Sequence, residues 1–548
     1  MLSESSLNLI YLSFIICSIV TAFFFIKLNT VSSTEDDSRL NKLSVFLLTF
    51  ALLFGTYIRF YCLDFGLPTP YHPDEWQKAR LLRKMMERGT LNPNFHALPP
   101  LLLYLSWLME SVIDLLGFYP NRTMLRILLA GRAVNAICGS ISIFLLYLIG
   151  KHLYSRFIGS LAAFFLAINP LHITNSRYMK EDALFLLFVL LTAYFVVRVV
   201  NEKKLSYLYL ASFLAGIACG AKYTGCVTVV MILAVPWLIQ DRIKIKPDIY
   251  FLKRTLFALV LMPIGLILTL PYTIGDYEAL TDVINGFLKE SKHAMEGHQG
   301  LIISAASQYW MYHFGRSVVP ALGWLISFFS LAAIGVAIRN KEMKLLWVAG
   351  IVLLFYLPAE WAQSKPPPQP DRYIIACIPF LLLLCSVLIE RVCRGRVVVL
   401  ASLILALTLQ PLYSTITLAS EIKNDTRAQM TEWMRNNLPK KTKIITAGEL
   451  TYLPKIPKGI KAKSLRKVIS KDRLQILEQI RASGYQYIIA TELTNPRFIV
   501  ESELGAKRFA SMKMMEDNFE LVKEWSAPSG QNGFHNPVLK LFLITPTH

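Results

Sequence analysis

Apolar stretches of about 16 to 22 residues recur from the start of the chain to about residue 412, separated by short polar loops. A helix needs about 20 such residues to cross the hydrocarbon core of a bilayer. The pattern therefore predicts a polytopic α-helical membrane protein with about twelve transmembrane helices. We expect them at residues 7–26, 43–63, 124–150, 157–170, 183–200, 205–220, 225–239, 256–271, 320–338, 345–357, 374–389 and 397–412. The first lacks a preceding basic segment and a following cleavage site, so it is expected to remain as a membrane helix.

Lys and Arg gather in every second loop, and such loops face the cytoplasm in most membrane proteins. The other loops then face outward and carry Asp74, Glu75, the turn at residues 180–182 and the segments 272–319 and 360–373. This predicts an extracytoplasmic active site in the plasma (inner) membrane. The basic loops contain Lys27, Arg39 and Lys42; Lys151 and Arg156; Arg198, Lys203 and Lys204; Arg242, Lys244, Lys246, Lys253 and Arg254; Arg339, Lys341 and Lys344; and Arg391, Arg394 and Arg396.

Two segments of the first outer loop need a separate interpretation. Residues 99–118 are apolar enough to span, but a span there would reverse all later loops, so we predict a juxtamembrane or re-entrant helix. The sequence after Asp74 is basic although it lies outside. An amphipathic interfacial helix with Leu81, Leu82, Met85 and Met86 on its apolar side would account for it.

The composition changes near residue 414 from apolar to mixed polar sequence. Helical patterns at 426–438 and 472–483 alternate there with strand patterns at 443–448, 485–491 and 538–544. We therefore predict a transmembrane domain over residues 1–413, with a catalytic first outer loop at 64–123, and an extracytoplasmic soluble α/β domain over 414–548.

Charge and cysteine content limit the classes of partner and site. The net charge is +20, which in a soluble protein would suggest nucleic acid. With 54% hydrophobic residues and a mean hydropathy of +0.45, we assign this charge to membrane orientation and contact with anionic lipids, and predict no nucleic-acid partner. The eight cysteines lie in or beside apolar stretches without metal-ligand spacing, so neither a disulfide framework nor a zinc site is predicted.

Two adjacent acids, Asp74 and Glu75, follow the second apolar stretch directly. Acids at a membrane boundary are energetically costly and indicate function. They suit glycosyl transfer from a lipid-phosphate-linked sugar, in which a carboxylate accepts the proton of an attacking hydroxyl and cations hold the departing phosphate. Asp74 is the predicted base, with Glu75 and Asp182 positioning the acceptor or a metal. The chain has no glycine-rich phosphate loop after a strand, which disfavours a nucleotide-sugar donor.

Four motifs together resemble the GT-C glycosyltransferases, and most closely their protein O-mannosyltransferase-like and aminoarabinose lipid A transferase-like members. They are His-Pro-Asp-Glu at 72–75, Leu-Ala-Gly-Arg-Ala-Val-Asn at 129–135, Ser-Arg-Tyr at 176–178 leading to Asp182, and Ala-Lys-Tyr-Thr-Gly at 221–225. The resemblance implies polyprenyl-phosphate sugar donors, a catalytic aspartate at Asp74 and a second acid at Asp182. The segment 369–373 is similar to an Arg-Tyr element near the donor phosphate, which implies phosphate contacts from Arg372 and Tyr373.

This chain departs from the family pattern through an extra early span and through Lys180 and Glu181, which crowd the second acid. Lys222, Arg177 and Lys180 are further candidates to bind the phosphate, and Arg316 lies in an outer loop that could order over the donor. Asp74 and Asp182 could also hold Mg²⁺ or Mn²⁺ against the phosphate.

Each candidate also has a purely structural interpretation. Asp74 and Glu75 are placed to begin the interfacial helix behind Pro73, and Glu181 and Asp182 to begin the next span, because acids stabilise a helix N-terminus. Lys222 could extend its ammonium group to a lipid headgroup.

The predicted function is transfer of a hexose or pentose from a polyprenyl-phosphate donor to a hydroxyl of a protein, lipid or glycan. A secondary transporter and a membrane scaffold with an outer binding domain are the alternatives. A transporter should show inverted repeats and acids near the membrane midplane, whereas these acids lie at span ends.

Overall fold

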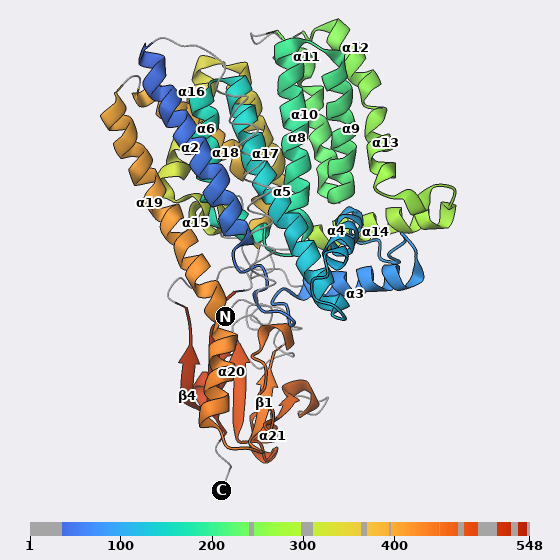
Figure 1. Cartoon of the computed structure of the whole chain (residues 1–548), viewed down its shortest axis with the longest axis vertical. Coiled ribbons are helices and arrows are strands. Elements are labelled where there is room, and N and C mark those ends of the chain that lie inside the picture. The colour runs from blue at the N-terminus through green and yellow to red at the C-terminus, as the bar shows by residue number, and fades with distance from the viewer. Residues whose placement is uncertain are drawn as a thin grey trace.

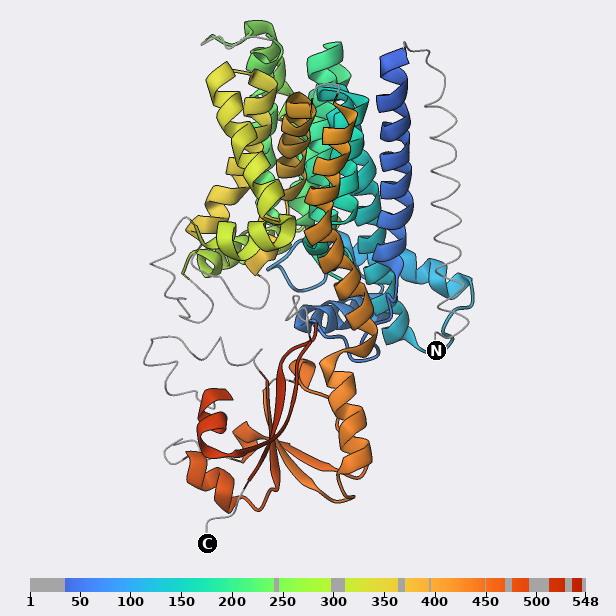
Figure 2. The same ribbon diagram turned by 90° about the vertical axis from the view of Figure 1, so that its left-hand side faces the viewer.

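A helical bundle carries a smaller sheet domain at one end (Figures 1 and 2). The protein is described by a computed structural model. It describes residues 35–240, 246–296, 311–362, 370–393, 396–448, 450–468, 476–491, 512–527 and 535–544. The predicted span at 7–26 lies outside these residues.

The bundle is built from helices that coincide with the predicted apolar stretches. The longer ones are α2 (Glu35–Phe60), α5 (Thr123–Leu153), α8 (Glu181–Glu202), α9 (Leu205–Ala221), α16 (Trp324–Asn340), α17 (Met343–Trp361), α18 (Ile378–Cys393) and α19 (Val397–Glu421). Shorter ones are α6 (Arg156–Ala167), α7 (Pro170–Asn175), η1 (Tyr223–Thr228), α10 (Val229–Leu233), α11 (Val235–Leu238), α12 (Ile249–Ala258), α13 (Leu261–Leu268), η2 (Pro271–Thr273), η4 (Phe314–Val318), α15 (Val319–Leu322) and η5 (Pro370–Ile374).

Within the part of the chain that the structure describes, fewer than twelve helices are long enough to span a membrane. Within the described residues, six helical segments have the required length and composition, or seven if the bent pair Phe314–Leu322 and Trp324–Asn340 is one span. The predicted number is therefore not confirmed. The difference arises from length: α6 has 12 residues, which at 1.5 Å per residue reach about 18 Å, whereas the hydrocarbon core is about 30 Å thick.

Close approach of small residues joins α5 and α6 near the turn between them. A Cβ atom on Gly150 of α5 would lie 2.6 Å from the Cα atom of Gly159 in α6, so the two backbones touch there. Such contacts are typical of helices packed within membranes. The connection between them is short because Ser155 caps α6 by accepting the backbone N–H of Ile158.

Three helices lie across the end of the bundle that faces the sheet domain: α3 (Pro73–Arg88), α4 (Leu101–Leu115) and α14 (Tyr277–Glu296) (Figure 1). The predicted juxtamembrane helix corresponds to α4, which is not among the helices long enough to span. The predicted interfacial helix corresponds to α3, which has proline at its first position and ends at Gly89 with φ at 62°. Leu82 and Met85, on the predicted apolar side, are buried against protein, as is Lys78, one of the basic residues that follow Asp74.

The sheet domain contains five strands in the order β2-β1-β3-β5-β4. β1 is parallel to β2 and β3, whereas β5 is antiparallel to β3 and β4. One face packs on α20 and the other on α21 and α23, which gives two small apolar cores. The composition change at residue 414 falls inside α19, which continues to Glu421. The elements are α20 (Thr426–Asn437), β1 (Lys443–Ala447), β2 (Lys461–Ser464), α21 (Ile476–Ala482), β3 (Tyr487–Thr491), α23 (Met512–Asn518), β4 (Glu520–Trp525) and β5 (Leu539–Leu543), with short helical turns η6 (Ile422–Asn424), η7 (Leu450–Tyr452) and η8 (Leu465–Lys467).

Candidate functional site

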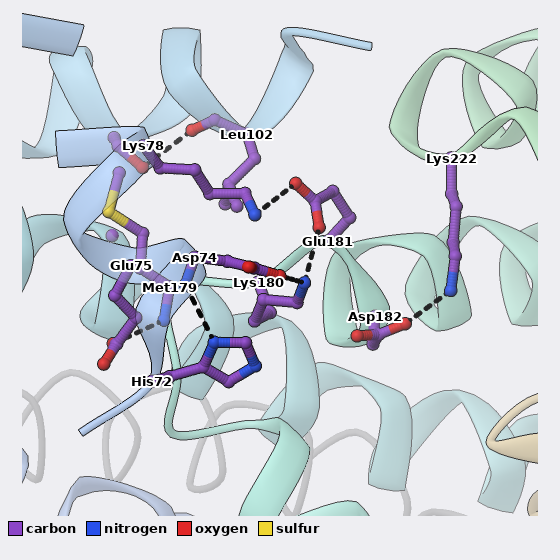
Figure 3. Close-up of polar contacts among 12 residues, drawn as sticks. His72, Asp74, Glu75, Lys78, Leu102, Met179, Lys180, Glu181, Asp182 and Lys222 are labelled. Atoms are coloured by element: carbon purple, nitrogen blue, oxygen red, sulfur yellow. Dashed lines mark hydrogen bonds and ion pairs between the residues drawn. The ribbon is translucent and has the colours of Figure 1, made fainter. Parts of the chain in front are cut away.

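Acids and cations from four separate segments meet at the end of the bundle that faces the sheet domain (Figures 1 and 2), and Figure 3 shows those of α3, α8 and α9. The N-terminus of α3 supplies Asp74, the start of α8 supplies Asp182, and the end of α9 supplies Lys222. The short helix η5 adds Arg372. These segments are far apart in the sequence, and the helix ends bring them to one level of the bundle.

Asp74 is the acid most open to solvent in this cluster, with 36% of its side chain exposed. The ammonium group of Lys180 is bonded to its Oδ2, and Nη1 of Arg372 lies 3.9 Å from the same oxygen. His72 caps α3 by accepting the backbone N–H of Asp74 at Nδ1 over 3.1 Å. Asp74 is therefore fixed at a helix N-terminus with two cations facing it.

The two acids that follow Lys180 take different partners. Oε1 of Glu181 accepts from Nζ of Lys78 over 2.8 Å, and Oδ1 of Asp182 accepts from Nζ of Lys222 over 2.6 Å. In Figure 3 the two lysines approach from opposite sides. Lys222, the partner of Asp182, lies near the ring of Tyr373, which follows Arg372. Asp182 is therefore the acid that shares the site with Arg372 and Asp74.

The charges of the cluster set the protonation state of its groups. Burial alone would raise the pKa of Asp74, but Lys180 and the neighbouring cations outweigh this and hold the pKa well below its ordinary value. Burial opposes the charge of Arg372, but Tyr373, Asp182 and Asp74 outweigh it and raise its pKa. Burial lowers the pKa of His72 well below its ordinary value, so its imidazole is neutral at neutral pH. The resting site therefore contains an ionised but weakly basic Asp74.

Glu75 does not face this cluster. Its carboxylate is fully buried and binds Nε and Nη2 of Arg132 over 2.7 and 2.9 Å. It also accepts the backbone N–H of Met179 over 2.9 Å, and Figure 3 shows it pointing away from Asp74. The structure thus places Glu75, predicted to contact the acceptor or a metal, in the scaffold that joins α3, α5 and the turn before α8.

Two predicted phosphate ligands also lie apart from the acids. Arg177 is buried, donates to the carbonyl oxygen of Tyr61 and lies over the ring of Phe65. Arg316 is exposed on the helical turn η4. Tyr373, by contrast, belongs to the cluster, since Arg372 and Lys222 lie 5.4 and 5.8 Å from the centre of its ring.

The side chains of the cluster do not fit a divalent cation well. Among the described residues, no group of three or more His, Cys, Asp or Glu side chains converges as metal ligands do. The position beside each predicted metal ligand, Asp74 and Asp182, is already taken by a lysine ammonium group. In this geometry the lysines neutralise the acids that a metal would otherwise bridge.

The sequence did not reveal Lys78 or His72 as parts of the cluster. Lys78 lies one helical turn after Asp74, which was a usable signal, because residues four apart share a helix face. Its pairing with Glu181 depends on how α3 docks against α8, and periodicity carries no information on that.

A cavity of about 770 Å³ is lined by residues of α3, the start of α5 and the segments that precede these two helices. Its wall combines apolar side chains such as Leu67 and Met86 with charged ones such as Arg83 and Arg122. It contains none of the predicted site residues.

Similarity to known proteins bears on the chemistry of this cluster. Residues 99–267 match the family described as Dolichyl-phosphate-mannose-protein mannosyltransferase. Over 125 residues, 23% of this chain, the sequence is 26% identical to Bacillus subtilis (strain 168) YkcB, a protein described provisionally as a mannosyltransferase. That match spans 18% of the length of YkcB.

Solved structures share the fold over nearly the whole chain. Apo ArnT from Cupriavidus metallidurans aligns with a TM-score of 0.52 at 12% identity, covering 91% of this chain and 98% of ArnT. The same protein bound to undecaprenyl phosphate gives 0.50 at 13% identity, covering 91% of this chain and 97% of ArnT. The Archaeoglobus fulgidus oligosaccharyltransferase, tethered to an acceptor peptide, gives 0.51 at 13% identity, covering 90% and 74%. Residues 99–267 thus resemble this mannosyltransferase family, and the chain shares the fold of ArnT and the oligosaccharyltransferase, in agreement with the GT-C resemblance of the four sequence motifs.

Proposed function

We propose that this protein transfers a sugar from a polyprenyl-phosphate-linked donor to a hydroxyl group of a protein, lipid or glycan acceptor outside the cytoplasm. The observation that carries the proposal is Asp74, a partly exposed carboxylate that faces Lys180 and Arg372. A base next to cations is what displacement of a phosphate by a hydroxyl requires. ArnT, which shares the fold, has been solved with undecaprenyl phosphate bound.

In the proposed reaction, the acceptor oxygen forms a bond to the anomeric carbon and its proton passes to Asp74. The bond from that carbon to the phosphate oxygen breaks, and the lipid phosphate leaves with the electron pair. A single displacement inverts the anomeric centre. Arg372, Lys222 and Lys180 would stabilise the departing phosphate, because charge develops there in the transition state.

The low pKa of Asp74 gives donor binding a second role. A carboxylate that faces Lys180 and Arg372 is a poor base, since base strength falls with pKa. An anionic phosphate would compete for both cations. Their withdrawal would raise the pKa of Asp74 and strengthen it as a base only when the donor is in place.

The arrangement of the bundle supports an extracytoplasmic site. The C-terminal ends of α5 and α8, where basic loops begin, lie at the end of the bundle opposite the sheet domain (Figure 2). Basic loops favour the cytoplasmic side. The acid cluster lies at the other end.

The proposal is tested by transfer of radiolabelled sugar from synthetic polyprenyl-phosphate donors, in parallel with nucleotide sugars, by purified wild-type protein and Arg372 variants. We expect transfer from the lipid donor alone. Arg372→Lys should raise the donor KM about ten- to a hundredfold, because a hydrogen bond to a charged group is worth about 1.5–3 kcal/mol and lysine lacks the guanidinium fork.

Arg316→Lys is the matched control, since Arg316 is exposed outside the cluster. An equal rise in KM for both variants would contradict the phosphate role of Arg372. No transfer by wild-type protein from any lipid donor, with a panel of acceptors, would reject the proposed function and favour the transporter.

We further propose that the lysines replace a divalent cation. EDTA treatment of the purified enzyme should leave the transfer rate unchanged, and added Mg²⁺ or Mn²⁺ should not raise it, because Lys180 and Lys222 already bind the two acids. Loss of activity with EDTA and its recovery with one of these ions would overturn this part of the proposal.

A further inference from the structure

A histidine of the sheet domain is buried in the loops that carry the candidate catalytic groups. His535 is 1% exposed and stacks on Tyr178, with ring centres 5.2 Å apart and planes at 13°. It also meets the edges of Phe65 and Tyr71 at 4.8 and 6.2 Å. Phe65 and Tyr71 belong to the segment before α3, and Tyr178 to the segment before α8. These three rings form an aromatic cage around His535.

The sheet domain holds His535 firmly through the start of α20. Asp425 caps that helix and accepts the backbone N–H of Asn536 over 2.8 Å. Thr426 donates from Oγ1 to the carbonyl oxygen of Pro537 over 2.7 Å. The guanidinium of Arg427, paired with Asp425, lies 3.6 Å from the ring centre of Tyr71. The turn that presents His535 is thus bonded to a helix and pressed on the cage.

The cage is connected to Asp74 through Tyr178 and His72. Tyr178 also contacts His72, with ring centres 5.2 Å apart and planes at 69°, and His72 accepts the backbone N–H of Asp74. Two residues after Tyr178, Lys180 provides the ammonium group bound to Asp74. Tyr178 therefore contacts the residue that caps Asp74 and lies two residues before the lysine that binds Asp74.

We propose that His535 is a positioning residue for the transfer reaction: by filling the cage it fixes Tyr178, and through Tyr178 the geometry of Asp74 and Lys180. This inference rests on the proposed function, which it deepens by giving the sheet domain a role in catalysis. The ring itself is the important feature, since Nδ1 of His535 has no hydrogen-bond partner among the described residues.

The test compares His535→Ala with His535→Phe in the full-length protein. Alanine empties the cage and should lower kcat about ten- to a hundredfold, because a small displacement of reacting groups has an effect of that size. The donor KM should rise less than it does in Arg372→Lys, because Arg372 and Lys222 lie outside the cage and still bind the phosphate. Phenylalanine keeps a ring in the cage and should retain most of kcat.

Leu541→Ala is the matched control. Leu541 is fully buried in β5, so its loss weakens the same domain without touching the cage. If Leu541→Ala lowers kcat as much as His535→Ala at the same loss of thermal stability, His535 acts only through folding and the proposal falls.

A second measurement does not depend on transfer. Labelling of amines by an N-hydroxysuccinimide ester, followed by mass spectrometry, reports the exposure of Lys180, whose side chain is 6% exposed. His535→Ala should raise labelling of Lys180 severalfold relative to Lys204, which is 62% exposed, while His535→Phe should not. Unchanged labelling would overturn the proposal even if wild-type protein transferred no sugar, and raised labelling without transfer would assign the failure to the proposed function.

Discussion

Asp74→Asn should abolish most sugar transfer while the protein remains folded. Loss of a general base lowers a rate by about 10²- to 10⁴-fold, and asparagine keeps the size of the side chain without its basicity. The fold should tolerate the change, because Asp74 is partly exposed and Lys180 retains a second acidic partner, Glu181, whose Oε2 lies 3.8 Å from its Nζ. The measurement is kcat for transfer from the lipid donor, with thermal unfolding of the same preparations.

Asp114→Asn is a suitable control for this experiment. Asp114 is 59% exposed on α4 and binds Arg126 over 3.0 Å, outside the cluster. Its loss should leave kcat within about twofold, because Asp114 lies outside the cluster and Arg126 keeps Glu110 as a partner. Equal rates for wild type and Asp74→Asn would remove Asp74 from the reaction and leave the cluster as a structural ion-pair network.

The pH dependence of wild-type transfer tests the proposed change in Asp74. A depressed pKa keeps the carboxylate charged, so any stability from its pairing is present above about pH 4, the ordinary pKa of aspartate, and is lost as pH falls through the lower folded pKa. The acid limb of kcat/KM, which reports the free enzyme, should therefore lie below about pH 4. The acid limb of kcat, which reports the donor complex, should lie at a higher pH, because the donor phosphate draws Lys180 and Arg372 away from Asp74.

The sequence predicted the positions of the helices better than their number. Apolar content locates a helix inside the membrane domain, but α6 and α18 are apolar because they are buried among other helices. Hydrophobicity alone does not distinguish a helix buried among other helices from a helix in contact with lipid. In the sheet domain, α20, β1, β3 and β5 lie where the pattern predicts them, whereas β2 and β4 were missed. Both are mostly exposed edge strands, without the alternation of buried and exposed residues that marks a half-buried strand.

Much of the cluster was visible in the sequence because Asp74, Asp182 and Lys222 all lie at span ends on one predicted side. The partners were not visible. Whether an acid binds Lys78, Lys180 or Arg132 depends on how helices dock, and adjacent residues on a helix point about 100° apart. That rotation separates Glu75 from Asp74.

Glu75→Gln should therefore have the opposite effect to Asp74→Asn, with a large loss of stability. Glu75 and Arg132 are both 0% exposed, and removal of one member of a buried ion pair typically costs about 3–5 kcal/mol, because the other charge remains buried without compensation. The same change weakens the acceptor for the backbone N–H of Met179, next to Lys180. The measurement is the free energy of unfolding of the detergent-solubilised protein, or the shift of its thermal midpoint.

Glu87→Gln on the same helix is the control, because its ion pair with Arg83 is more than half exposed on both sides and contributes about 0–1 kcal/mol. The double variant Glu75→Gln, Arg132→Met should recover part of the lost stability, since it leaves no unpaired charge. Recovery should be incomplete, because Arg132 also donates to the carbonyl oxygens of Leu63 and Phe65. A Glu75→Gln protein as stable as Glu87→Gln but inactive would contradict this prediction. Glu75 would then take part in the reaction, and its side chain would have to face the Asp74 cluster in the active protein.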